Sequence, residues 1–124
     1  MNKVGTIKIN GVDYKVCLST SVLMALEDRN GRTTDEELNA ILSSTSVKDL
    51  FWLLDKMLQA GYKYAVKLGD TGVPEPPTFE DLVDCTLVSD YKTMFSDLKN
   101  AVAESSKPDV EIQNEKNAPT TPGI

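Results

Sequence analysis

The sequence predicts a mostly α-helical domain of the α+β class: an N-terminal two-stranded β-hairpin packed on a bundle of four to five helices, with a disordered C-terminal tail. Three observations predict it. Residues of alternating polarity flank Asn10-Gly11 in the segment IKINGVDYKV. Apolar residues then recur at helical spacing as far as residue 104. The segment 105–124 lacks this periodicity and contains three prolines. We therefore expect one folded domain at 1–104 and a tail at 105–124.

The hairpin is the clearest local signal. Asn10-Gly11 tolerates positive φ at both central positions, which favours a two-residue type I′ turn. Such a turn sets the pairing of the strands: Ile9 with Val12, Lys8 with Asp13, and Ile7 with Tyr14. One face then carries the four apolar or aromatic residues Ile7, Ile9, Val12 and Tyr14. Because an isolated hairpin is marginal in water, this face is expected to lie on the helices.

Two short helices are expected next. The first has three candidate N-caps, Ser19, Thr20 and Ser21, and ends before Asn30-Gly31. In the second, Thr34 and Glu37 have the spacing of a capping box. Its apolar stripe consists of Leu38, Ile41 and Leu42.

The third predicted helix is the longest and is expected to be the centre of the core. It begins after Ser46 and ends near Leu68, with Gly69 as its stop. Its apolar face comprises Val47, Leu50, Phe51, Leu54, Met57, Leu58, Ala65 and Leu68. Prolines exclude a helix from the connector 69–77.

The last helical region is expected to break in two. Thr78 and Asp81 cap its start, and its first apolar face comprises Phe79, Leu82, Val83 and Thr86. The apolar phase then shifts to Tyr91, Met94, Phe95, Leu98 and Val102. Because one straight helix would scatter these residues around its surface, we place a break near Ser89, which caps a second segment from Asp90 to about Glu104.

Composition argues against several classes of function. Nineteen acidic and 13 basic residues give a net charge of −6, which disfavours binding to a phosphate backbone. The sequence has no apolar run long enough to span a membrane and no N-terminal signal core, so we expect a soluble, intracellular protein. The two cysteines, Cys17 and Cys85, are expected to be reduced, buried thiols.

No catalytic, cofactor or metal site is expected, and the protein is predicted not to be an enzyme. The sequence has no histidine, the commonest general base and metal ligand. Neither cysteine has a recognisable activating group. The acidic run 35–37 fits the first turn of a helix, where the positive end of the helix dipole favours carboxylates, better than it fits a metal site.

Trp52 departs from the apolar pattern of its helix. It falls on the polar side, about 140° from Val47, beside lysines that include Lys56. One interpretation is that Trp52 packs under the hairpin or a terminal helix with an edge toward water. A second is a partner contact, with Tyr62 at its rim and Phe51 alongside. A third is a stacking site for single-stranded nucleic acid along the lysines Lys48, Lys56, Lys63 and Lys67.

The order of the segments resembles that of the phage tail assembly chaperones, which bind the tape-measure protein of long-tailed bacteriophages and prophages. The resemblance spans roughly residues 5 to 100. It consists of a short strand segment, a helix ending in Leu-Glu-x-x-x-Gly (26–31), and a helix rich in leucine and aromatic residues (50–60). The proline-rich connector and the tail have no counterpart in this pattern.

The resemblance implies a non-enzymatic protein of the host bacterial cytoplasm that keeps the helical tape-measure protein soluble before the tail tube polymerises. Such a chaperone is absent from the mature virion. Self-association and contact with the tail-tube protein are further implied partners. The partner-binding residues expected from helical phase are Trp52, Tyr62, Phe51 and Lys56. The alternatives are a structural virion component, such as a tail-completion or connector protein, and a small nucleic-acid-binding regulator.

Overall fold

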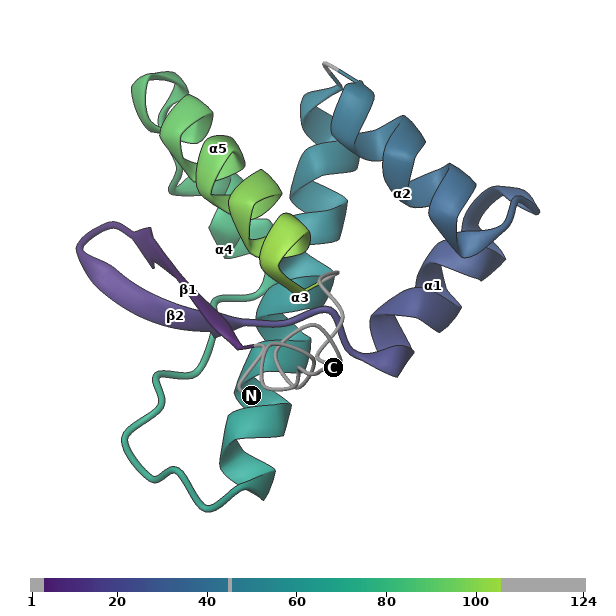
Figure 1. The fold of residues 1–124 in the computed structure, drawn as a ribbon. Coiled ribbons are helices and arrows are strands. Elements are labelled where there is room, and N and C mark those ends of the chain that lie inside the picture. The colour runs from purple at the N-terminus through teal and green to yellow at the C-terminus, as the bar shows by residue number, and fades with distance from the viewer. Residues whose placement is uncertain (1–3, 45, 106–124) are drawn as a thin grey trace, which may run out of the picture.

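The computed structural model describes residues 4–44 and 46–105, and its architecture confirms the predicted fold. The elements in chain order are β1 (Gly5–Ile9), β2 (Val12–Val16), α1 (Thr20–Asn30), α2 (Thr34–Ser43), α3 (Val47–Lys67), α4 (Phe79–Asp84) and α5 (Val88–Ser105). The central α3 has the hairpin, α4 and α5 on one side and α1 and α2 on the other (Figure 1). The predicted tail lies outside the described residues apart from Ser105, which ends α5.

The hairpin has the predicted turn and register. Asn10 and Gly11 both have positive φ, 50° and 83°, and the three predicted cross-strand pairs are present. Ile7 and Ile9 are buried, as expected of the apolar face. Val12, which pairs with Ile9 beside the turn, is 40% exposed, so next to the turn this face is buried on β1 but not on β2.

Gly61 allows the hairpin to approach α3 closely. A Cβ built on Gly61 would overlap the carbonyl group of Lys15 and lie 2.6 Å from the Cα of Val16. The backbone N–H of Cys17 also donates a hydrogen bond to the carbonyl of Met57 at 3.3 Å. Strand β2 therefore packs directly on the backbone of α3, while β1 packs on α5.

Three of the predicted helix boundaries are confirmed. Gly31 ends α1 in the left-handed conformation, with φ 70°. Ser46 accepts a hydrogen bond from the N–H of Asp49 at the start of α3, and Thr78 accepts one from the N–H of Asp81 at the start of α4.

Two boundary predictions were wrong. The capping box of α2 is formed by Thr33 and Glu36, not by Thr34 and Glu37, so the cap begins one residue earlier. Ser89 does not cap α5, because the helix already begins at Val88. The predicted break exists, but it lies between the end of α4 at Asp84 and Val88.

The buried surface of α3 is wider than one apolar stripe because elements pack on it from several directions. Leu53 and Ala60, which were outside the predicted face, are buried, whereas Val47 and Leu68 at the helix ends are 42% and 67% exposed. On α4, Leu82 is buried but Phe79 and Val83 are exposed. Cys17 is buried as expected, but Cys85 is exposed at the end of α4.

Candidate partner-binding groove

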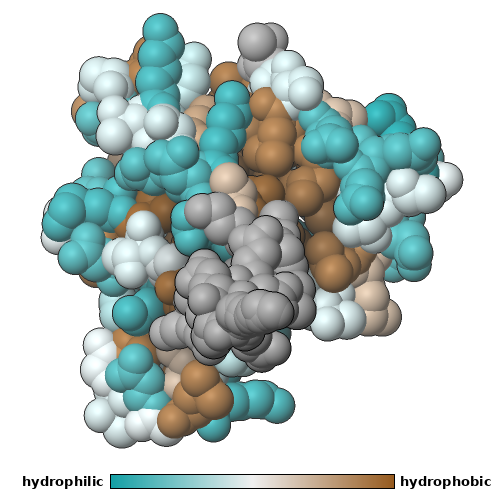
Figure 2. All heavy atoms as spheres, viewed as in Figure 1, coloured by the Kyte–Doolittle hydropathy of each residue, from teal (hydrophilic) through white to brown (hydrophobic). Residues whose placement is uncertain are grey.

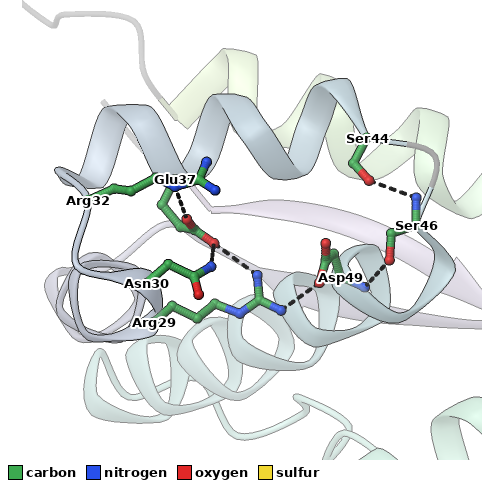
Figure 3. A network of polar contacts seen from close by, with 7 residues as sticks. All are labelled: Arg29, Asn30, Arg32, Glu37, Ser44, Ser46 and Asp49. Carbon is green, nitrogen blue, oxygen red and sulfur yellow. Dashed lines mark hydrogen bonds and ion pairs between the residues drawn. The ribbon is translucent and has the colours of Figure 1, made fainter.

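A cluster of charged and polar side chains joins α1, α2 and α3, and we call it the polar corner: Arg29, Asn30, Arg32, Glu37 and Asp49 (Figure 3). Glu37 is 1% exposed, yet its carboxylate accepts hydrogen bonds from Arg29 and Asn30, both at 3.0 Å. The other end of the Arg29 guanidinium donates to Asp49 at 2.6 Å. Arg32 adds an ion pair to Glu37 at 3.5 Å.

The charged groups of the polar corner pair with one another. Burial alone would lower the pKa of Arg29, but hydrogen bonds to Asp49 and Glu37 outweigh it and raise the pKa. Glu37, from α2, is thus neutralised by groups from α1 and the loop that follows it, and Arg29 is tied to α3 through Asp49. The cluster holds three helices together. The Oε1 atom of Glu37 is buried without a hydrogen bond to the described residues, and its partner is Arg32, with which it forms an ion pair.

Trp52 belongs to the same corner. The guanidinium of Arg29 lies 4.4 Å from the centre of its ring, and the ammonium of Lys56 lies 5.8 Å away. The ring is half-buried and packs against the core. Arg29 of α1 is thus stacked on Trp52, whereas the first of the three interpretations expects the hairpin or a terminal helix to cover the ring.

The other predicted partner-binding residues do not gather around Trp52. Phe51 is 5% exposed and packs edge-to-face on Phe95 of α5, with ring centres 5.1 Å apart. Tyr62 is half-buried nearly three turns further along α3. Of the four predicted residues, only Trp52 and Lys56 are brought together.

A second surface was not foreseen, and we call it the apolar groove. It lies between α5 and the junction of α2 with α3, and its volume is about 370 Å³. Its floor consists of Leu50 and Phe95, which are nearly fully buried, and half-buried Tyr91. Figure 2 shows a band of apolar side chains between α5 and α2, over α3. The groove exists because α5 packs mainly on β1 while α2 packs on α1 and α3.

The rim of the apolar groove is polar and basic. It consists of Ser44, Lys92, Ser96 and Lys99. The last three have the i, i+4, i+7 spacing of one helix face. Both lysines are exposed, and neither forms an ion pair with any carboxylate that the structure describes.

The opposite flank of α5 has the reverse charge. A hollow of about 460 Å³ separates it from the hairpin turn and is lined by Asp90, Thr93 and Asp97, with Lys8 on the hairpin side. Asp90 and Asp97 of α5 therefore face the hairpin, and Lys92 and Lys99 face the groove. The sequence contains the signal for this arrangement, in the heptad spacing of Asp90 and Asp97 and of Lys92 and Lys99, but the pattern does not say which element each face meets.

Several other kinds of site have no support within residues 4–44 and 46–105. No cluster of three potential metal ligands occurs there, and no helix of that part is long and apolar enough to cross a membrane. Burial raises the pKa of the Cys17 thiol, which keeps it protonated and unreactive. Comparisons of the chain with protein-family models, curated proteins and solved structures find no match.

Proposed function

We propose that this protein is a phage tail assembly chaperone that binds an apolar helical stripe of the tape-measure protein in the apolar groove. The observation that carries the proposal is the groove itself, an apolar floor with a polar rim between α5 and the junction of α2 with α3. Such a surface suits an amphipathic helix that lays its apolar face into a hydrophobic cleft.

The charge of the molecule supports the same function. A chaperone must keep an aggregation-prone client dispersed while its apolar stripe is covered. The net charge of −6 gives a complex the mutual repulsion that keeps protein particles apart. Release by competition with tail-tube subunits needs no nucleotide, because the affinity of a helix for an open groove depends only on the surfaces that meet.

Co-expression with a long helical tape-measure candidate tests the proposal. The chaperone is expected to increase the soluble fraction of the client. Ser96→Trp, which fills the groove, is expected to abolish the increase, because Ser96 lies on the rim. Thr93→Trp is the matched control, since Thr93 lies on the opposite flank of α5.

An unchanged soluble fraction with the wild-type protein would contradict the proposed function. Equal loss of activity in both tryptophan variants would contradict the assignment of the groove. Mass spectrometry of purified particles separates the chaperone from the alternative of a structural virion component, which would be retained in them.

A further inference from the structure

We infer that the apolar groove selects helices whose apolar stripe is flanked by Asp and Glu, against the overall charge of the protein. The two ionisable cations of its rim, Lys92 and Lys99, lie on one face of α5 beside the apolar floor. Their carboxylate complement is therefore expected along the edge of the bound helix.

The first step is that Lys92 and Lys99 are exposed and have no carboxylate partner among the described residues. Some cations in the described part of the chain lie beside carboxylates: Arg29 pairs with Glu37 and Asp49, and Lys8 pairs with Asp13 at 3.2 Å. Other exposed lysines, such as Lys48 and Lys63, form no ion pair within that part, but they do not line the apolar groove. Lys92 and Lys99 have no such partner there and remain exposed. Their charge is thus available to a partner that docks against Tyr91 and Phe95.

The spacing of the lysines carries the second step. Lys92 and Lys99 are seven residues apart, which is about 10 Å along the axis of α5. A helix lying along the groove presents carboxylates of one face at the same heptad spacing. Two ion pairs can therefore form at once with a client helix that repeats Asp or Glu every seven residues beside its apolar stripe.

The contrast between the two flanks of α5 carries the third step. Among the residues that the structure describes, none that lines the groove is acidic, although the chain as a whole has a net charge of −6. Asp90 and Asp97 lie on the hairpin side of the same helix. A client with basic flanks would thus be attracted by the molecule as a whole but repelled at the groove, and local charge dominates at contact distance in physiological salt.

Two synthetic peptides test this selection. Each has roughly 20 residues and the same leucine stripe, and the positions beside the stripe are glutamate in one peptide and lysine in the other. This inference rests on the function proposed above, under which the groove is the client site. Binding of either peptide therefore tests that function, and the difference between the two affinities tests the charge selection. Fluorescence anisotropy of labelled peptide with the full-length protein measures both affinities.

The glutamate peptide is expected to bind about tenfold more tightly than the lysine peptide. The reason is that it gains two ion pairs with the rim lysines, whereas the lysine peptide meets two repulsions there. The double variant Lys92→Glu/Lys99→Glu is expected to reverse the preference. The control Lys63→Glu/Lys67→Glu changes the net charge by the same amount on exposed positions of α3 and is expected to keep it.

Three results would overturn the inference. Equal affinities for both peptides, unchanged in Lys92→Glu/Lys99→Glu, would show that the groove binds helices without charge selection and would leave the proposed function standing. A preference that is lost equally in both double variants would assign it to net charge. Binding of neither peptide would contradict helix binding by the groove, and with it the proposed function.

Discussion

The polar corner and the apolar groove lie on the same central helix and use charge in opposite ways. In the corner, the Arg29 guanidinium forms ion pairs with Glu37 at one end and Asp49 at the other, both within the molecule. At the groove, Lys92 and Lys99 have no carboxylate partner among the described residues and flank an apolar floor. A network of charges paired within the molecule stabilises the fold, whereas unpaired cations beside an apolar groove are suited to a partner. Charged residues therefore indicate a binding surface only once it is known whether they already pair within the molecule.

Removal of Glu37 is expected to have the largest effect on stability. Glu37→Ala leaves Arg29 and Asn30 without their buried acceptor, and we expect a loss of about 3 kcal/mol in the free energy of unfolding. This value is at the lower end of the range for a broken buried ion pair, because Asp49 still faces Arg29. Urea denaturation measures the loss. Asp35→Ala, an exposed carboxylate in the same helical turn, is the control. A loss below about 1 kcal/mol would place the corner among weak surface networks.

Trp52→Ala distinguishes the corner from the groove directly. The half-buried ring packs on the core under Arg29, so its loss is expected to cost about 2 kcal/mol, less than a fully buried tryptophan. Affinity for a groove-binding peptide is expected to change by less than about twofold. A large loss of affinity in folded Trp52→Ala protein would restore Trp52 as the partner contact that the sequence predicted.

Asp55 is a half-buried carboxylate of α3 that, unlike Asp49, has no guanidinium partner among the described residues. Burial raises its pKa above the ordinary 3.8, although Lys56 and Gln59 act in the opposite direction. The charged form therefore costs stability at neutral pH, and the cost disappears as the pH falls through the raised pKa. Asp55→Asn is expected to raise Tm at pH 7 by less than about 3 °C. The gain is expected to shrink toward pH 4, and a gain that grew on acidification would contradict burial as the cause.

The smallest effect on stability is expected at the groove rim. Lys92→Ala/Lys99→Ala removes two exposed charges that stabilise nothing within the described residues, so the free energy of unfolding is expected to change by less than about 0.5 kcal/mol. Thermal and urea denaturation measure this change, and the same protein is expected to bind the acidic-flanked peptide more weakly. A substantial loss of stability would mean that the lysines have a structural role like that of Arg29.

The contact surface could be predicted only in part from the sequence. Helical phase correctly identified Trp52 as out of pattern and placed Lys56 beside it, because both follow from positions on one helix. Phe51 was assigned to the same surface, yet its ring lies against Phe95, 44 residues later in the chain. The position of α5 relative to α3 decides this contact, and a one-dimensional pattern does not contain it.

Local chemistry in the sequence determined the hairpin and most of the helix ends. Asn10-Gly11 permits only a few turns, and Ser46 and Thr78 satisfy N–H groups within their own helices, so these features need no information from distant residues. Tertiary structure alone decided the remaining features. Gly61 lies against a strand more than 40 residues earlier, and the apolar groove arises where α5, packed on β1, leaves a space beside the junction of α2 with α3. These features depend on how whole helix faces pack, and packing is a property of all the elements together.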